Sequence, residues 1–266
     1  MCTRRLYGWM RNQDCEVWSI AMAYHTHQEI TFLQAFSCAM KYVPLCFGIK
    51  SLIMTIDDIL DADVDKLVER TKLRPVPRGA ITMGRAWLFF FIQAVIGLGL
   101  SRWMNFAPIP LGLMFNVGTF MGWADLTHES TLPWNVLVPI YVGTCLWTIT
   151  YETVYQHQDK IDDVKIGLHS PALLLGSSTI PVCATTGVGF FALLAYAGAL
   201  NGHGWCYYSA VVFACILLML RLSKTDIDKP EDCKSFFLQT VPVGQIILSG
   251  IVGDVILNRL VNNIAL

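Results

Sequence analysis

Seven long apolar segments, separated by polar connections, dominate the pattern of this chain. A helix that crosses a membrane needs roughly 17–25 mostly apolar residues. The segments that meet or approach this length are Thr31–Ile56, Ala86–Leu100, Phe106–Ala124, Leu132–Tyr151, Ser178–Leu200, Gly204–Leu222 and Phe236–Leu257. The pattern predicts an all-α fold, a polytopic transmembrane helical bundle. We expect residues 31–266 to form one transmembrane domain, and residues 1–30 to be a partial or disordered N-terminal segment.

The composition agrees with a membrane protein. Of the 266 residues, 54% are hydrophobic and only 15% are charged, whereas an ordinary soluble domain has about a quarter charged residues. The net charge of −1 gives no indication of a nucleic-acid partner, and we expect none. Nine cysteines are scattered without C-x-x-C spacing, so neither a disulfide framework nor a zinc site is expected from them.

The polar connections differ in their positive charge. Asp57–Arg85, Glu152–His169 and Arg221–Ser235 all contain Lys or Arg, whereas Asp125–Thr131 and Asn201–His203 contain neither. Because positive charge concentrates in cytoplasmic loops, the first three connections are predicted to lie on the cytoplasmic side.

The count of spans conflicts with this topology. Three candidate helices separate the first basic connection from the second, and an odd number puts the two on opposite faces of the membrane. We therefore predict that a helix is missing between Asp65 and Asp159.

Two acidic clusters carry the candidate chemistry. In the first, Asp58, Asp61 and Asp65 follow at i, i+3 and i+7, which places them on one stripe of a helix. In the second, Asp159 and Asp163 are i, i+4 neighbours. Like charges at this spacing repel unless a cation neutralises them, and Mg²⁺ suits carboxylates and phosphate oxygens. The alternative is that both clusters are solvated loops at helix ends.

Cations accompany both clusters. Arg70, Lys72 and Arg74 follow the first, and Lys160 lies within the second. They are positioned to clamp the oxygens of a diphosphate. They also fit positive-inside anchoring, and the two roles can coexist.

The two motifs resemble those of the UbiA superfamily of membrane prenyltransferases. The chain has Asp57-Asp58-x-x-Asp61-x-x-x-Asp65 and then Arg70-Thr71-x-x-Arg74-Pro75, similar to the family's NDxxDxxxD and RTxxRP. Tyr155-Gln156-His157-Gln158-Asp159-Lys160-Ile161-Asp162-Asp163 is similar to the YxHQDKxDD of its 4-hydroxybenzoate-transferase branch. The resemblance runs from about Lys50 to the C terminus. The family has nine helices, four of them between the motifs, which implies that one or two helices are missing here, the break lying near Leu100–Arg102.

The resemblance implies a role for each motif residue. Arg70, Lys72, Arg74 and Lys160 would stabilise the leaving pyrophosphate, and Asp57 stands where the family has an Asn that contacts substrate. Magnesium and the allylic diphosphate would be held by Asp58, Asp61, Asp65, Asp159 and Asp163.

The implied reaction is the transfer of an isoprenyl group, farnesyl in our prediction, from its diphosphate to an aromatic acceptor. An allylic cation would form in a dry pocket lined by Trp, Phe and Tyr, whose ring faces tolerate a cation. The motif form is similar to that of fungal meroterpenoid enzymes, which prenylate aromatic polyketides in secondary metabolism. Two alternatives are a UbiA-type terpene cyclase acting on farnesyl diphosphate, because Asp57–Asp61 also reads DDxxD, and an inactive truncated homologue.

Three further residues have two interpretations each. Tyr155 is expected to line the acceptor pocket or to belong to an interfacial aromatic belt. His157 is expected to contact the acceptor or to make a helix-end hydrogen bond. His25 forms an H-x-H pair with His27, which we interpret as two surface residues rather than metal ligands. Without a convincing transit peptide, the endoplasmic reticulum is favoured over the mitochondrial inner membrane.

Overall fold

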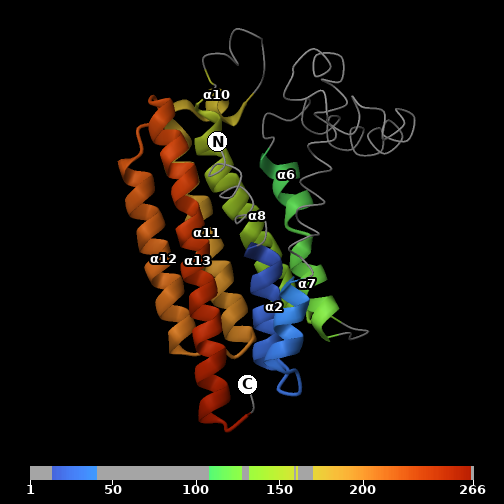
Figure 1. Ribbon diagram of the computed structural model, residues 1–266. Coiled ribbons are helices and arrows are strands. Elements are labelled where there is room, and N and C mark those ends of the chain that lie inside the picture. The colour runs from blue at the N-terminus through green and yellow to red at the C-terminus, as the bar shows by residue number, and fades with distance from the viewer. Residues whose placement is uncertain (1–13, 41–107, 128–131, 159, 161–169, 265–266) are drawn as a thin grey trace, which may run out of the picture. The chain divides into compact units, whose positions relative to one another are not determined.

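The computed structural model describes residues 14–40, 108–127, 132–158, 160 and 170–264, apart from a few side chains in 108–127. All of them belong to one of two compact units, which comprises Met1–Tyr42 and Asn105–Leu266. The other unit, Val43–Met104, lies wholly outside the described residues. The described segments contain helices and no strand (Figure 1), which confirms the predicted all-α fold.

The helices have the following bounds. They are α2 (Asp14–Thr26), α6 (Pro108–Phe115), α7 (Gly118–Thr127), α8 (Trp134–Gln156), α10 (Pro171–Leu175), the 3₁₀ turn η1 (Gly176–Ser178), α11 (Thr179–Leu200), α12 (Trp205–Lys224) and α13 (Pro230–Val261). Residues 32–40 are also helical. Four of the predicted spans therefore correspond to α8, α11, α12 and α13.

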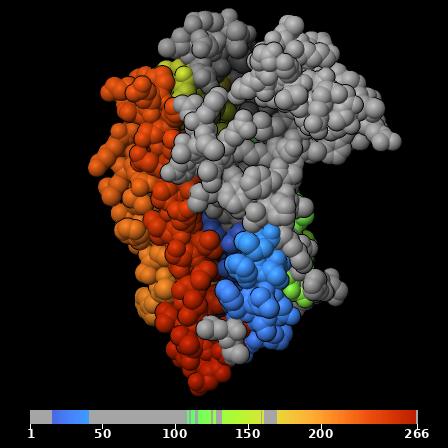
Figure 2. All heavy atoms as spheres, viewed as in Figure 1, coloured from blue at the N-terminus to red at the C-terminus, as the bar shows by residue number. Residues whose placement is uncertain are grey.

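Within the described residues, three stretches are long and apolar enough to cross a membrane: Pro171–Leu200, Trp205–Lys224 and Pro230–Val261. Many of their large apolar side chains face outwards, among them Val212, Phe213 and Ile216 of α12. Figure 2 shows α12 and α13, in orange and red, forming a continuous part of the surface. An apolar face of this kind suits lipid rather than water, so the described helices fit an integral membrane protein.

The helices pack side by side with their axes roughly aligned (Figure 1). α8 packs against α6, α11 and α13, while α12 packs against α11 and α13. α2 packs against α7 and α13. The fully buried residues include Trp18 of α2, Trp123 of α7, Phe190 of α11 and Tyr207 of α12. Large aromatic side chains from four helices thus form much of the core.

One predicted span is interrupted. The segment Phe106–Ala124 is not a single helix, because α6 ends at Phe115 and α7 begins at Gly118. Asn116 accounts for the break: its side-chain Nδ2 donates to the carbonyl of Gly112 at 2.7 Å, beside the backbone N–H of the same residue at 3.2 Å. The amide side chain competes for the carbonyl groups that a continuous helix would use.

The helix α2 was not predicted as a membrane span. Its sequence mixes apolar residues with Glu16, Ser19 and His25, and all three are buried. Polar residues that are buried against other helices lower the mean hydropathy of the segment, so a hydropathy pattern does not indicate a membrane span there. Glycines of α7 make room for them: a Cβ on Gly122 would lie 2.6 Å from the carbonyl oxygen of Glu16.

Candidate functional site

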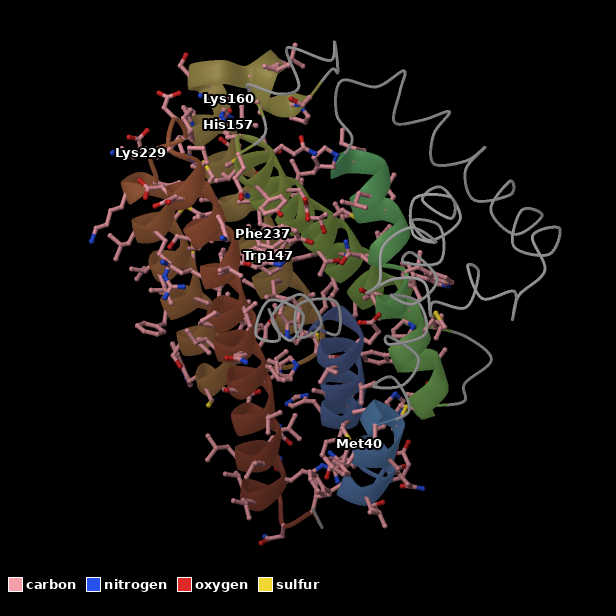
Figure 3. All side chains as sticks on the ribbon, turned by 45° about the horizontal axis from the view of Figure 1, so that its top comes forward. Met40, Trp147, His157, Lys160, Lys229 and Phe237 are labelled. Atoms are coloured by element: carbon pink, nitrogen blue, oxygen red, sulfur yellow. The ribbon has the colours of Figure 1, made fainter. Side chains whose placement is uncertain are left out.

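Most residues of the predicted diphosphate site lie outside the described part of the chain. This holds for Asp57, Asp58, Asp61, Asp65, Arg70, Lys72, Arg74, Asp159 and Asp163. The segment around Leu100–Arg102, where a helix was predicted to be missing, also lies outside it. The structure does place three residues of the second motif. Tyr155 lies in the last turn of α8, and His157 and Lys160 follow at its C-terminal end (Figure 3).

The end of α8 is fixed by local hydrogen bonds. The backbone N–H of His157 donates to the carbonyl of Val154 at 3.2 Å, and that of Gln158 donates to the carbonyl of Tyr155 at 3.1 Å. The Gln158 side chain donates to the same Tyr155 carbonyl at 3.1 Å. These bonds satisfy carbonyl groups that a helix end otherwise leaves open.

His157 joins α8 to α11. Its ring is buried, and Nε2 lies 2.8 Å from the hydroxyl oxygen of Thr179, the first residue of α11. Burial lowers the pKa of His157, and the nearby Lys160 ammonium lowers it further, although Asp228 and the Ile227 carbonyl act in the opposite direction. The imidazole is therefore neutral at physiological pH. The helix-end hydrogen bond that we considered for His157 is thus present.

Lys160 is held by the connection between α12 and α13. Its ammonium donates to the carboxylate of Asp228 and, at 3.4 Å, to the carbonyl of Ile227. The Asp228 side chain is 78% exposed, and the Lys160 side chain is 26% exposed. In the same connection, Lys229 pairs with Asp226 at 3.0 Å. The second motif is therefore attached to a segment nearly seventy residues away.

Aromatic rings lead from the second motif into the core. The ring of Tyr155 lies 4.2 Å from that of Phe237, centroid to centroid, and Phe237 also contacts Tyr151 edge-on at 5.9 Å. Tyr151 in turn contacts Trp147 at 5.7 Å. Trp147 then lies 5.1 Å from Phe190 of α11. Figure 3 shows Phe237 and Trp147 on the side of His157 and Lys160 that leads into the bundle.

A small polar network lies beside this aromatic series. The Nδ2 of Asn116 donates to the hydroxyl of Thr148 at 3.1 Å, and the hydroxyl of Tyr151 donates to the same oxygen at 3.3 Å. The hydroxyl of Thr148 itself donates a hydrogen bond to the backbone carbonyl of Thr144 at 3.0 Å. These groups give an otherwise apolar region oriented hydroxyl and amide dipoles, which could orient a polar substituent of an acceptor.

Sequence reasoning missed several of these partners. Asp228, Thr179 and Phe237 come from other helices or connections, and no spacing in the sequence links them to the second motif. For Asp228, a signal was available: the connection Arg221–Ser235 was noted for its cations, but it also contains Asp226, Asp228, Glu231 and Asp232.

The prediction that His25 is a surface residue is wrong. Its side chain is 5% exposed and lies 3.5 Å from the Oδ2 of Asp254 on α13. The sequence around His25 did not indicate this, because His203 and Asp254 are far away in the chain and reach His25 only through the packing of α2 against α13 and the course of the α11–α12 connection.

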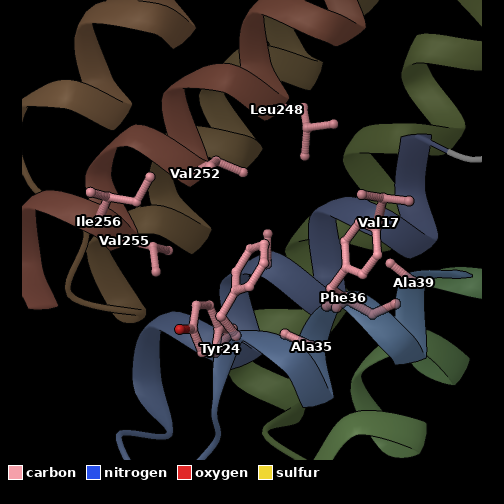
Figure 4. Close-up of a pocket in the computed structure, with 12 residues that line it drawn as sticks. Val17, Tyr24, Ala35, Phe36, Ala39, Leu248, Val252, Val255 and Ile256 are labelled. Atoms are coloured by element: carbon pink, nitrogen blue, oxygen red, sulfur yellow. The ribbon is translucent and has the colours of Figure 1, made fainter. Parts of the chain in front are cut away.

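One pocket among the described residues has no charged or metal-binding side chains in its lining. It has a volume of about 180 Å³ and lies between α2, the helix at residues 32–40 and α13 (Figure 4). Val17, Phe36, Leu248 and Val252 are among its lining residues, and none of the lining residues is charged. It is therefore not a site for a diphosphate.

Comparisons with known proteins show which family the sequence matches. The model of the UbiA prenyltransferase family matches residues 16–117 and 102–243. The chain is 31% identical to the mitochondrial 4-hydroxybenzoate polyprenyltransferase of Schizosaccharomyces pombe, over 89% of this chain and 73% of that protein. It is 32% identical to the protein of the same name from Arabidopsis thaliana, over 92% of this chain and 64% of the relative.

A solved structure shares the fold. The apo structure of a UbiA homolog from Aeropyrum pernix K1 superposes with a TM-score of 0.62 at 18% sequence identity. The superposition covers 92% of this chain and 98% of that one. At this level of identity, the likeness concerns the arrangement of the helices.

Proposed function

The chain belongs to the UbiA prenyltransferase family, and on this premise we propose that it transfers an isoprenyl group from its diphosphate to an aromatic acceptor within a membrane. The observation that carries the proposal is the placement of the second motif. Its Lys160 and His157 lie at the end of α8, next to a series of aromatic rings that leads into the core.

The described residues have two different roles in the proposed reaction: one stabilises the diphosphate by its charge, and the others shield the allylic cation from water. Lys160 offers an ammonium at the end of the bundle, where a departing diphosphate would gain negative charge. Tyr155, Phe237 and Trp147 offer ring faces to an allylic cation and exclude water from it. Before a diphosphate binds, the contact between Lys160 and Asp228 holds the second motif against the α12–α13 connection.

We assign the metal to the carboxylates of the two motifs. Asp58, Asp61, Asp65, Asp159 and Asp163 provide only hard oxygen ligands, which suits Mg²⁺. When bound, the metal supplies positive charge that neutralises the diphosphate. Asp57, Arg70, Lys72 and Arg74 complete the proposed diphosphate site from the first motif.

The identity of the two substrates is a finer question. Both relatives compared above are named as 4-hydroxybenzoate polyprenyltransferases, so 4-hydroxybenzoate is the first acceptor to test. A farnesyl donor and a polyketide-derived acceptor of meroterpenoid biosynthesis stay predictions from the motif form. The relatives are also named as mitochondrial, so we propose a mitochondrial membrane in place of the endoplasmic reticulum.

The test uses the full chain in purified membranes. Isoprenyl diphosphates of increasing length are incubated with 4-hydroxybenzoate and with an aromatic polyketide, with Mg²⁺ or with EDTA, and products are identified by mass spectrometry. We expect a prenylated acceptor only when Mg²⁺ is present. Asp61→Ala and Asp159→Ala should abolish the product, whereas Asp226→Ala, in the exposed connection, should not.

The same experiment separates the alternatives. A cyclic hydrocarbon released from farnesyl diphosphate without acceptor would identify a terpene cyclase instead. If wild-type membranes that contain folded protein give neither product, the chain is an inactive homologue. Fluorescence microscopy of the tagged chain beside mitochondrial and endoplasmic-reticulum markers decides the compartment.

A further inference from the structure

Three buried side chains converge at the end of the bundle that is opposite Lys160. They are His25 of α2, His203 of the α11–α12 connection and Asp254 of α13, and their nitrogen and oxygen donor atoms all lie within 4.8 Å of one another. The connection that contains His203 follows the C terminus of α11, whereas His157 and Lys160 lie near the N terminus of α11. The cluster is therefore separated from the proposed diphosphate site by the length of α11.

His25 is the unusual member of the cluster. Its side chain is 95% buried, and the backbone carbonyl of Asn201 acts on the ring as a hydrogen-bond acceptor. Its Nε2 points towards the Oδ2 of Asp254 at 3.5 Å, which is too long for a hydrogen bond. Buried polar groups are nearly always paired, so an unpaired imidazole nitrogen beside a buried carboxylate indicates a ligand between them.

The protonation of the cluster suits a metal ion. The pKa of His203 is lowered to about 4, chiefly by burial and then by the neighbouring His25, although Asp254 acts in the opposite direction. A neutral imidazole keeps a lone pair that can bind a metal. Two histidines and one carboxylate are also a common zinc ligand set.

We propose that His25, His203 and Asp254 bind one Zn²⁺ ion that fastens α2 to the α11–α12 connection and to α13. The three ligands come from three separate segments, so one ion would join elements that are far apart in the sequence. Nitrogen donors favour zinc over magnesium, which prefers oxygen ligands and waters. The site is thus chemically distinct from the carboxylate motifs.

Two of the three donor-atom distances are near those of a zinc site. Zinc bonds of about 2.0–2.1 Å place tetrahedral ligand atoms roughly 3.3 Å apart. Here the Nδ1 of His203 lies 2.8 Å from the Oδ2 of Asp254, and the Nε2 of His25 lies 3.5 Å from the same oxygen. The ion would take the place of the proton that His203 shares with Asp254, and the neutral ring would carry its proton on Nε2 instead.

Neighbouring groups hold the ligands in place. The backbone N–H of Gly204 donates to Asp254, at 2.9 Å to Oδ2. The Nδ2 of Asn201 lies 3.2 Å from the Nε2 of His203. With zinc on Nδ1, Nε2 would carry a proton, so the terminal amide of Asn201 would turn its oxygen towards the ring. This turn would give up the bond from Nδ2 to the carbonyl of Met22 and place Nδ2 beside the hydroxyl of Thr26. The nearby Arg259 is engaged elsewhere: it donates to the carbonyl groups of Tyr24 and His27.

The first measurement uses zinc and cobalt with the purified full chain. We introduce Asp159→Asn and Asp163→Asn in all samples to weaken metal binding at the second motif. After dialysis against a zinc buffer, we expect one zinc per chain. Cobalt in place of zinc should give the intense visible absorption of a tetrahedral site with nitrogen and oxygen ligands.

Matched variants show which residues bind the ion. His25→Gln, His203→Gln and Asp254→Asn should each lose the zinc and the cobalt band, whereas His27→Gln, two residues from His25, should keep both. Asn201→Ala should weaken zinc affinity roughly 10–100-fold. If a variant does not fold, the cobalt spectrum of the parent protein decides alone. No tetrahedral cobalt band in the parent, or equal zinc in all folded variants, would overturn the proposal and indicate an adventitious ion only. Because the readout is metal content, the result is independent of the proposed enzymatic activity.

Discussion

At the scale of single residues, the ion pair between Lys160 and Asp228 is compatible with the proposed function, in which the Lys160 ammonium would leave Asp228 to bind a diphosphate. Both side chains reach solvent, and Asp228 is 78% exposed. Exposed pairs of this kind contribute only about 0.2–1 kcal/mol. Lys160 can therefore exchange the carboxylate for a diphosphate at little cost. The pair positions the ammonium without competing strongly with the substrate.

The first prediction concerns these two residues. Lys160→Gln should lower kcat for prenyl transfer by about 100-fold, since one preorganised donor to developing negative charge has roughly that effect. Asp228→Asn should lower kcat by less than about 10-fold, because the lost contact is weak. Steady-state kinetics with saturating acceptor measure both. Asp226→Asn, which affects the neighbouring pair with Lys229, is the control. An unchanged kcat for Lys160→Gln would contradict the assigned role.

The second prediction concerns pH and His157. Its pKa in the folded protein is below its ordinary value of 6.5, chiefly because the ring is buried. The unfolded chain then takes up a proton more readily, so the stability from neutral His157 is present above about pH 6.5 and is lost as the pH falls. Melting temperatures between about pH 7.5 and pH 5.5 should fall less for His157→Gln than for the wild type. Equal decreases would exclude His157 as a source.

The residues of the second motif were predicted from the sequence, but their partners were not. Tyr155, His157 and Lys160 are recognisable because they lie within one continuous motif. Phe237, Thr179 and Asp228 contact them only after α11 and α13 have packed against α8. Neither helix periodicity nor charge patterning contains that information.

At the scale of helices, apolar length predicted α8, α11, α12 and α13 well, because their lipid-facing and core-facing sides are both apolar. It failed for α2 and for the division between α6 and α7. In both places a buried polar group decides the outcome: Glu16 and His25 lie within α2, and Asn116 interrupts the predicted span. Such groups depend on partners in other helices, so hydropathy alone does not reveal them.

The third prediction concerns the contact between α2 and α7. A methyl group on Gly122 would lie 2.5 Å from the hydroxyl of Ser19 and 2.6 Å from the carbonyl oxygen of Glu16. Because the carbonyl belongs to a helix backbone, Gly122→Ala should force the helices apart and cost about 1–3 kcal/mol. At Gly189 a methyl group would meet only the end of the Leu146 side chain, at 3.0 Å. Gly189→Ala should therefore cost less. Thermal unfolding in detergent compares the two, and equal losses would contradict the close packing of α2 on α7.

At the scale of the whole molecule, the sequence predicted the fold class and the family. The helical architecture of the described segments confirms the first, and the family match confirms the second together with the enzyme class. The assembly of the diphosphate site stays a prediction, because the first motif and Asp159 and Asp163 lie outside the described residues. The same holds for the missing helix, since the ranges between the motifs are described only in part.

The fourth prediction concerns the membrane topology of the consecutive helices α11, α12 and α13. If α12 crosses the membrane, the connections at its two ends must face opposite sides. Trp205 is 90% exposed at one end, and the Lys229 side chain is 68% exposed beyond the other. Trp205→Cys and Lys229→Cys should therefore react with an impermeant maleimide from opposite sides of sealed vesicles. The parent chain measures the labelling of native cysteines. Since Lys160 contacts the α12–α13 connection, the proposed diphosphate site would lie on the side that labels Lys229→Cys. Labelling of both variants from one side would show that α12 does not span the membrane.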